Sequence, residues 1–501
     1  MNQLHVFFFP LLAPGHMIPT LDMAQLFISR GVKTTIIATP GFDKLIENAR
    51  ESGFDIGMHV LKFPPEKSEL PDEIKSLDQT SDDLIPMFAK ALELLQEPVE
   101  KLLEEFRPDC LVADMFFPWA VDSAAKFDIP RLVFHGTCYL SLCSSEHMRI
   151  YEPFKNVSSD SEQFVLPNLP HELMFTRPQV VFHFDQEETE NDFTKQLIRI
   201  QESETRSYGV LVNSFSELEP DYADHYRKVL RRKAWHIGPL FLWNKGGEEY
   251  KAQRGKESAI DEHECLEWLN SKEPNSVVYI CFGSMATFTE KQLHEIAKGL
   301  EISGQKFIWV VRKGKNLEED EKENWLPEGF EERTKDKGLI IRGWAPQLLI
   351  LENKAIGGFV THCGWNSTLE GVCSGVPMVT WPVFAEQFYN EKLVTDVLRI
   401  GVSVGNKQWK RIGSEGVERE AIDTAIRRIM EGEEGAEMRR RAQEYKEKAR
   451  KAVEEDGSSY TDLSALFEEL SAIKVGQRDN REKLYRPKGN NMNQLSSYFS
   501  E

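Results

Sequence analysis

The chain has 501 residues, which is too long for one ordinary hydrophobic core and predicts two or three domains. Hydrophobic residues make up 41% of the sequence and charged residues 28%, so the composition excludes a disordered or fibrous protein. The formal net charge of -20 argues against nucleic acid and anionic membranes as partners, because both are negatively charged.

Short apolar runs alternate with helical patterns in the first half of the chain. The predicted strands cover residues 6–9, 34–38, 110–113, 131–134 and 209–212, and a helical pattern follows the first of them. This alternation indicates a parallel sheet with crossover helices. The opening MNQLHVFFFPLLAPGH lacks the basic start of a signal peptide, so we expect a buried strand there. No stretch reaches the roughly 20 apolar residues of a membrane span, and stable membrane insertion is not expected.

Polar residues follow three of these predicted strands. His16 lies between the first strand and the first helix, where we expect the positive helix end to keep the imidazole neutral and able to accept a proton. Asp114 follows residues 110–113, and a carboxylate on one imidazole nitrogen would fix the tautomer while the other nitrogen takes a proton. A lone histidine is more often a solvated or capping residue. Asp122 is expected on a helix surface, and a structural role is favoured for His135.

The alternating pattern stops around residues 238–262, where glycine and charged residues predict a linker. We therefore assign residues 1–240 to one domain, 241–262 to the linker and 263–473 to a second domain. The second series of predicted strands covers residues 276–282, 306–311, 338–342, 356–360 and 377–380. A charge-rich stretch at 431–452 predicts a solvated helix. Residues 474–501 carry few apolar side chains and are expected to be a disordered polar tail.

The segment HCGWNS, residues 362–367, joins a predicted strand to a predicted helix. Gly364 permits close backbone approach, and Asn366 and Ser367 suit the first turn of a helix. The N–H groups there, with His362 and the Ser367 hydroxyl as further donors, predict a phosphate or diphosphate site. Simple capping of the helix explains the same polar residues equally well. Ser284, in FGS after another strand, is a second phosphate candidate for which a plain turn is the stronger alternative.

The surrounding sequence decides between these interpretations. From Trp344 to Gln387 the chain reads WAPQLLILENKAIGGFVTHCGWNSTLEGVCSGVPMVTWPVFAEQ. This segment closely resembles the plant secondary-product glycosyltransferase box, the signature of family 1 UDP-sugar-dependent glycosyltransferases, and the resemblance extends over most of residues 1–470. It implies an α/β protein with the GT-B fold, in which two doubly wound Rossmann-like domains face each other across a cleft. The acceptor would bind in the N-terminal domain and the donor in the C-terminal domain.

The resemblance also implies individual roles. His16 matches the family's catalytic histidine and Asp114 its catalytic aspartate. The residues implied for the donor are Trp344, Ala345 and Gln347 at the uracil, Glu370 at the ribose, His362, Asn366, Ser367 and Ser284 at the diphosphate, and Trp365, Glu386, Gln387 and Thr137 at the sugar. A flat indole face suits a base, and an acid–amide pair gives a sugar directional polar contacts. Glutamine at the last box position resembles the glucose-using members.

The implied function is that of an inverting UDP-glucose-dependent O-glucosyltransferase acting on a hydrophobic plant secondary metabolite. A flavonoid or another phenolic is the expected acceptor, and a triterpenoid or steroid is the alternative. A non-catalytic sugar-nucleotide-binding protein is disfavoured because both His16 and Asp114 are present. An oxidoreductase is disfavoured because no G-x-G-x-x-G follows the first strand. The acceptor pocket is expected to be shaped by loops near residues 66–95 and 145–195.

The expected partners are a UDP-sugar and a small hydrophobic acceptor, bound by a monomer. UDP-glucose is a co-substrate, and no cofactor or metal is expected, since no Asp-x-Asp pair of metal-dependent sugar transferases is present. The helix dipole and His362 would instead stabilise the leaving UDP. Seven cysteines without a Cys-x-x-Cys pair favour a reduced, cytoplasmic setting.

Overall fold

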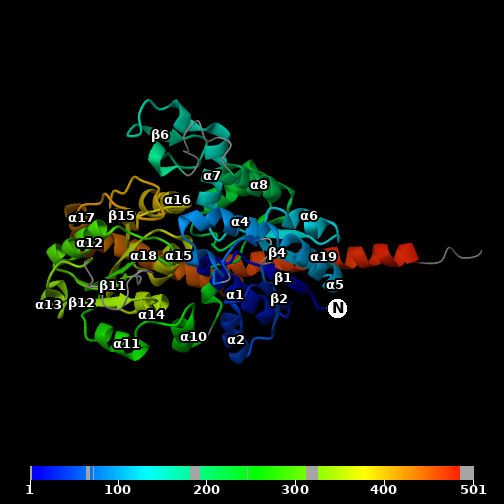
Figure 1. Ribbon diagram of the computed structural model, residues 1–501, viewed down its shortest axis with the longest axis horizontal. Helices are drawn as coiled ribbons and strands as arrows, with labels where there is room; N and C mark the ends of the chain where they lie inside the picture. The colour runs from blue at the N-terminus through cyan, green and yellow to red at the C-terminus, as the bar shows by residue number, and fades with distance from the viewer. Residues whose placement is uncertain are drawn as a thin grey trace, which may run out of the picture.

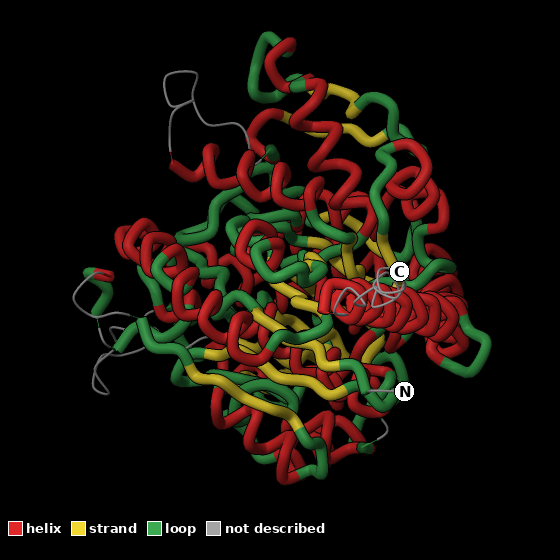
Figure 2. The backbone as a smooth tube through the Cα atoms, turned by 90° about the vertical axis from the view of Figure 1, so that its right-hand side faces the viewer, coloured by secondary structure: helices red, strands yellow, loops and turns green. Residues whose placement is uncertain are grey.

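The computed structural model describes residues 3–63, 68–71, 73–180, 192–244, 246–311 and 325–485. In this part of the chain two lobes, each built around a parallel sheet, lie side by side (Figure 1). The strands run through the interior of the molecule and helices lie outside them (Figure 2). Each lobe is thus an α/β unit, as the alternating sequence pattern predicts.

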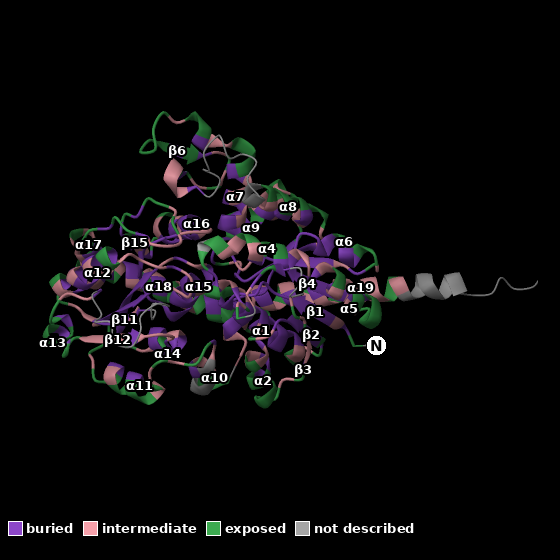
Figure 3. Ribbon diagram, in the orientation of Figure 1, coloured by how far each residue is buried: buried purple, intermediate pink, exposed green. Residues whose placement is uncertain are grey.

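The N-terminal sheet has the strand order β3-β2-β1-β4-β5-β8-β9, and its pairs are parallel. Its strands are β1 (His5–Phe9), β2 (Lys33–Ala38), β3 (Ile56–Val60), β4 (Cys110–Asp114), β5 (Arg131–Phe134), β8 (Gly209–Val212) and β9 (Ala234–His236). The central strands are buried and almost wholly apolar because helices cover both faces of the sheet (Figure 3). Since β1 and β4 are neighbours, their carboxyl ends lie next to each other. The two edge strands β3 and β9 were not predicted from the sequence.

The helices of this lobe are α1 (Pro14–Ser29), α2 (Asp43–Glu51), α4 (Ile85–Glu93), α5 (Gln96–Phe106), α6 (Ala120–Ala125), α7 (Tyr139–Tyr151), α8 (Asp192–Arg206) and α9 (Pro220–Asp224). Short helical turns occur at η1 (Leu77–Gln79), η2 (Asp82–Leu84), η3 (Pro153–Asn156), η4 (Arg177–Gln179), η5 (His225–Val229) and η6 (Leu240–Leu242). An antiparallel hairpin of β6 (Gln163–Leu166) and β7 (Leu173–Thr176) projects at the top of Figure 1.

The C-terminal sheet has the order β12-β11-β10-β13-β14-β15, again parallel. Its strands are β10 (Val277–Cys281), β11 (Lys306–Val311), β12 (Gly338–Arg342), β13 (Ile356–Thr361), β14 (Met378–Thr380) and β15 (Gly401–Ser403). Around them lie α11 (Glu262–Asn270), α12 (Glu290–Ser303), α13 (Phe330–Thr334), α14 (Gln347–Glu352), α15 (Trp365–Ser374), α16 (Gln387–Lys392), η7 (Leu393–Val397), α17 (Arg419–Met430) and α18 (Gly432–Val453). The side chains of Asp261 and Thr289 cap α11 and α12, which fixes where these helices begin.

The structure corrects one of the predicted boundaries and shows a helix inside the predicted linker. Residues 241–262 contain α10 (Gly247–Gln253). The last helix, α19 (Ser458–Tyr485), starts before residue 473 and continues past it, and it runs across to the N-terminal lobe (Figure 1). Its Leu463, Leu466 and Leu470 are buried in the N-terminal core, because leucines at this spacing form one apolar face that needs a partner. Residues 486–501 of the predicted tail lie outside the described residues.

Candidate active site

A cavity of about 1790 Å³ takes its lining from both lobes. The carboxyl ends of the parallel strands point toward it, which is where ligands bind in open α/β sheets. Thirteen of the fourteen predicted site residues line this cavity: His16, Thr137, Ser284, Trp344, Ala345, Gln347, His362, Trp365, Asn366, Ser367, Glu370, Glu386 and Gln387. The exception is Asp114, which lies behind His16. The fold therefore brings together five separate parts of the sequence, namely those around His16, Asp114, Thr137 and Ser284 and the box from Trp344 to Gln387.

His16 and Asp114 form a close pair at the carboxyl ends of β1 and β4. His16 lies in the first turn of α1, and its Nδ1 is 2.6 Å from Oδ2 of Asp114. The histidine side chain is 22% exposed, whereas the aspartate side chain is fully buried and also accepts a hydrogen bond from the Phe116 N–H. A carboxylate only accepts, so Nδ1 carries the proton and Nε2 keeps its lone pair. The pair can therefore act as a positioned general base.

The environment of His16 shifts its pKa upward, because carboxylates surround the ring. Burial acts to lower the pKa of His16, but the carboxylates of Asp114 and Glu386 oppose it, and the net result is a raised pKa. The sequence predicts that the α1 N-terminus favours a neutral ring, and the structure adds a carboxylate at 2.6 Å that acts in the opposite direction. Glu386 belongs to the other lobe, so the proximity of the lobes contributes to the basicity of His16.

His362 lies at the end of β13, closely confined by two glycines. A Cβ on Gly283, whose φ is +69°, would lie 2.6 Å from Nε2 of His362, and one on Gly364 would lie 2.4 Å from the same atom. Both contacts are too short for any other residue. Burial lowers the pKa of His362 to about 4, and its Nδ1 is buried without a hydrogen-bond partner. His362 is therefore a neutral imidazole with a polar group still unsatisfied.

The start of α15 answers the question that the HCGWNS segment left open. The N-cap is Gly364, which has no side chain to cap the helix. Asn366 instead donates to the carbonyl oxygen of Gly15 at 2.7 Å, and the Ser367 hydroxyl accepts from Gln347 at 3.0 Å. The polar residues of this turn are thus not its caps, which removes the capping interpretation. Its first N–H groups are of the kind that bind an anion at a helix N-terminus.

A polar network continues from Ser367 along the cavity wall. Gln347 donates to Glu370 at 2.6 Å as well as to Ser367, and it accepts from the Tyr279 hydroxyl at 3.2 Å. Glu370 is buried on α15. Glu370, the residue predicted to bind the ribose, is therefore held in a fixed orientation by Gln347 of its own lobe.

Arg254 is a site residue that the sequence analysis missed. Its guanidinium lies 2.5 Å from Glu370 of the C-terminal lobe and 2.8 Å from Asp22 on α1 of the N-terminal lobe. The side chain is only 11% exposed, and although burial acts to lower its pKa, the two carboxylates raise it well above its usual range. One cation thus joins two buried carboxylates from different lobes. No sequence signal could find it, because it lies in a non-periodic, charge-rich segment.

The residue after Arg254 packs against the predicted uracil platform. Gly255 has a φ of +102°, and a Cβ there would lie 2.4 Å from Cζ2 of Trp344. The Ala259 N–H donates to the carbonyl oxygen of Trp344 at 2.8 Å. The indole Nε1 of Trp344 is buried without a partner. The segment between the lobes therefore fixes the position of this indole.

The predicted sugar contacts lie at the junction of the lobes. Thr137 is buried with an unpartnered hydroxyl, so it has a hydrogen bond to offer a ligand. Gln387 accepts from the N–H groups of Val383 and Phe384 through Oε1, which leaves its amide nitrogen as the donor. Burial raises the pKa of Glu386, although its contact with Asn390 acts in the opposite direction. The indole N–H of Trp365 donates to the carbonyl oxygen of Asn213 at 2.8 Å. Because Asn213 belongs to the N-terminal lobe, this hydrogen bond joins the two lobes.

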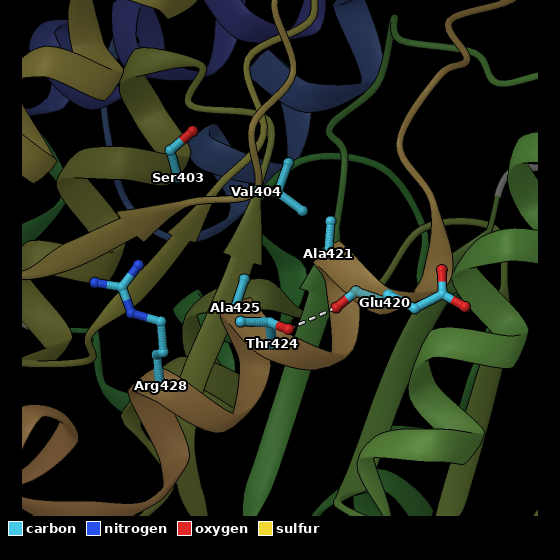
Figure 4. Close-up of a pocket in the computed structure, with 7 residues that line it drawn as sticks. All are labelled: Ser403, Val404, Glu420, Ala421, Thr424, Ala425 and Arg428. Atoms are coloured by element: carbon cyan, nitrogen blue, oxygen red, sulfur yellow. Dashed lines mark hydrogen bonds between the residues drawn. The ribbon is translucent and has the colours of Figure 1, made fainter.

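A second, smaller cavity contains none of the predicted residues. It has a volume of about 370 Å³ and lies between β15 and α17 (Figure 4). The Thr424 hydroxyl there donates within its own helix to the Glu420 carbonyl oxygen, and Arg428 pairs with Glu434.

Among the described residues, no cluster of three or more His, Cys, Asp or Glu side chains is placed to hold a metal, and no helix is long and apolar enough to span a membrane. The seven cysteines are buried free thiols.

Replacing Trp344 with alanine is expected to weaken UDP binding by about one to two orders of magnitude. Stacking of a base on an aromatic ring contributes about 1 to 3 kcal/mol, and alanine removes it. Isothermal titration of UDP measures the effect. The control is Trp268→Ala, since Trp268 lies on α11 outside the cavity. Unchanged UDP affinity in Trp344→Ala would mean that the uracil binds elsewhere.

Replacing Arg254 with methionine is expected to lower thermal stability clearly. The change leaves Asp22 and Glu370 buried without their counterion, and removing one partner of a buried ion pair costs about 3 to 5 kcal/mol. Thermal unfolding at one fixed scan rate compares this variant with Arg440→Met. Arg440 makes exposed ion pairs on α18, for which the expected cost is below about 1 kcal/mol. Equal shifts in both variants would show that Arg254 does not hold the lobes together.

Comparison with known proteins gives a consistent result. A family model described as "UDP-glucoronosyl and UDP-glucosyl transferase" matches residues 94–434. The chain is 60% identical to scopoletin glucosyltransferase of Nicotiana tabacum, over 94% of this chain and 98% of that protein. It is 56% identical to anthocyanin 3'-O-beta-glucosyltransferase of Gentiana triflora, over 94% and 99% of the two chains.

Solved structures of similar fold carry ligands in their complexes. Glycyrrhiza uralensis UGT73P12, complexed with glycyrrhetinic acid 3-O-monoglucuronide, has a TM-score of 0.88 and 41% identity, with 96% of this chain and 98% of that chain covered. Medicago truncatula UGT71G1, complexed with UDP-glucose, has a TM-score of 0.73 and 26% identity, with 94% and 98% covered.

Proposed function

The chain belongs to family 1 of the plant UDP-glycosyltransferases, with the GT-B fold, and on this basis we propose that it transfers glucose from UDP-glucose to a hydroxyl group of a phenolic acceptor. The observation that carries the proposal is the His16–Asp114 pair. His16, which Asp114 orients, faces the same cavity as the glycosyltransferase box, and that box contains the N-terminus of α15. An acceptor at the base and a donor at the proposed diphosphate site can thus bind in the same cavity.

In the proposed reaction, Nε2 of His16 removes the proton of an acceptor hydroxyl as its oxygen attacks the anomeric carbon. The bond from that carbon to the UDP oxygen breaks, and UDP leaves from the opposite face, so the configuration inverts. Asp114 stabilises the imidazolium that forms. The N-terminus of α15 and the neutral His362 stabilise the charge on UDP by hydrogen bonding. The proposal needs no cofactor or metal, because the N-terminus of α15 and His362 stabilise the negative charge on the leaving UDP.

Two findings support a phenolic acceptor and glucose as the sugar. The relatives that are 60% and 56% identical to the chain are named as glucosyltransferases for scopoletin and for the 3' position of anthocyanins. Gln387 is the last residue of the box, and glutamine at this position resembles the family members that use glucose. Its Oε1 accepts from the backbone, so its amide nitrogen stays available to donate to the sugar. A larger triterpenoid or steroid acceptor is the second candidate. It is favoured by the TM-score of 0.88 to UGT73P12, whose complex holds a glycyrrhetinic acid glucuronide. We further propose a cytoplasmic monomer.

The test is mass spectrometry of reactions that contain the purified protein, UDP-glucose and a panel of coumarins, flavonols, simple phenolics and triterpenoid aglycones, each with and without a chelator. A product heavier by one hexose establishes the transfer and names the acceptor class. Parallel reactions with UDP-galactose test the donor preference. Transfer that the chelator abolishes would contradict the metal-independent mechanism. A protein that neither modifies any acceptor nor releases glucose from UDP-glucose would contradict the proposed function.

A further inference from the structure

Asn390 lies directly behind the predicted sugar site and is fully buried. It belongs to α16 and follows Glu386, which lines the cavity just before this helix begins, by one helical turn. Residues four apart lie on the same side of a helix, so the two side chains are neighbours. The amide nitrogen of Asn390 donates to Oε1 of Glu386 at 3.1 Å. The carboxyl group predicted to bind the sugar is therefore held from behind.

The Asn390 amide has three further partners. Its Nδ2 also donates to the Cys363 carbonyl oxygen at 2.8 Å. Its Oδ1 accepts from the Ser141 hydroxyl at 2.7 Å and from the Cys138 thiol at 3.4 Å. A backbone carbonyl oxygen can only accept, so the amide nitrogen must point toward Cys363 and the amide oxygen toward Ser141. Both N–H groups and both lone pairs of the amide are thus used, and the side chain has one orientation.

Two of these partners belong to the other lobe. Cys138 is the N-cap of α7 and Ser141 lies in its first turn, and α7 lies beside α16 (Figure 1). The start of α7 is in turn fixed by Glu219, whose carboxyl oxygens accept from its first two N–H groups at 3.0 and 2.8 Å. Asn390 therefore sets the position of Glu386 relative to the lobe that supplies the base.

The backbone segments that Asn390 contacts are unfavourable by themselves. Cys363 has a φ of +63°, and Ala385, which precedes Glu386, has a φ of +55°. Residues with a side chain rarely adopt this left-handed conformation, and they keep it only where surrounding contacts hold them. Asn390 provides such contacts, because it binds the carbonyl oxygen of Cys363 and the side chain that follows Ala385.

We propose that Asn390 is a positioning residue for the donor sugar: with Ser141 it holds the Glu386 carboxyl group in the orientation that accepts hydrogen bonds from the sugar hydroxyls. The inference rests on the proposed function and deepens it, since it concerns recognition of the sugar rather than of the nucleotide. A side chain that is already ordered loses less conformational freedom when the ligand binds. Asn390 is buried behind Glu386, so its effect on the sugar passes through Glu386. UDP has no sugar and does not depend on this arrangement.

The experiment measures the Kd of UDP-glucose and of UDP by isothermal titration without acceptor, in the wild type and in Asn390→Asp. Aspartate has the same shape, but with at most one proton it cannot donate to both Cys363 and Glu386. The Kd of UDP-glucose is expected to rise by about tenfold, while the Kd of UDP stays within about twofold. Asn353→Asp is the matched control, since Asn353 binds Asn270 at the surface of the same lobe, and both Kd values should be unaltered.

The Glu386→Ala background separates positioning from a general structural defect. Glu386→Ala alone should raise the Kd of UDP-glucose by about tenfold or more. Adding Asn390→Asp to it should change that Kd by less than about twofold, because the group that Asn390 holds is gone. A further tenfold loss in the double variant, or an equal loss for UDP and UDP-glucose in Asn390→Asp, would overturn the inference. An unchanged Kd in Glu386→Ala would overturn it too.

Ser141→Ala keeps the inference testable if Asn390→Asp fails to fold. It removes only the hydroxyl that reaches Asn390 from the other lobe, so we expect a rise of about threefold in the Kd of UDP-glucose and none in that of UDP. An unchanged Kd of UDP-glucose in this variant would contradict the inference. These titrations need no acceptor. A protein that shows the expected Kd changes but modifies no acceptor in the panel would therefore contradict the proposed function alone.

Discussion

Replacing His16 with alanine is expected to lower kcat by about 100- to 10,000-fold, which is the usual contribution of a general base. The alanine removes the only side chain that the Asp114 carboxylate orients toward the cavity within the described residues. UDP affinity should stay nearly unchanged, since the predicted UDP contacts come from the C-terminal lobe. Product formation by chromatography gives kcat, and calorimetric titration with UDP gives Kd.

Two comparisons make this result interpretable. His263→Ala removes an exposed histidine on α11 and should leave both quantities unaltered. If His16→Ala loses UDP affinity as well as turnover, then His16 belongs to the donor site and the role proposed for it is wrong. If turnover persists at the wild-type rate, then the hydroxyl is activated by another group.

Replacing Asp114 with asparagine is expected to lower kcat by a similar factor and to shift the pH profile. Asparagine can donate to Nδ1 of His16 and so favour the wrong tautomer. The Asp114 carboxylate raises the pKa of His16 against the effect of burial, so its removal lowers that pKa. The base must be neutral to act, and activity therefore rises as pH passes through the pKa of His16. The acid limb of the residual activity should move to lower pH.

The matched control is Asp122→Asn. Asp122 is exposed and pairs with Arg206 on the surface, so the same chemical change there should leave kcat and the acid limb unaltered. Measurement of kcat/KM across the pH range separates the two effects, since a merely structural defect would lower activity without moving the acid limb. An acid limb that moves to higher pH in Asp114→Asn would mean that the Asp114 carboxylate does not raise the pKa of His16.

Local sequence patterns were sufficient to predict much of the fold and to indicate the candidate site residues. Apolar runs such as residues 110–113 and 356–360 became buried strands, because the side chains of a sheet covered on both faces must all be apolar. The box from Trp344 to Gln387 indicated the donor site because its residues are close in sequence. His16 and Asp114 were found separately, each at a strand end, and neighbouring parallel strands then brought them together.

Other features depended on contacts that no local pattern records. Arg254 became a site residue only because the packing of the lobes placed Asp22 and Glu370 on either side of it. The helix α19 reached the N-terminal lobe because its leucines find an apolar partner there and nowhere along their own sequence. The raised pKa of His16 and the contacts of Asn390 likewise follow from charges and atoms contributed by distant segments.

Short-range order along the chain was therefore enough to indicate the family, most of the central strands and the two candidate catalytic side chains. Which residues share a cavity and a charge environment depended on the packing of the two lobes. The physical reason is that electrostatic and packing energies depend on distance in space rather than on distance along the chain.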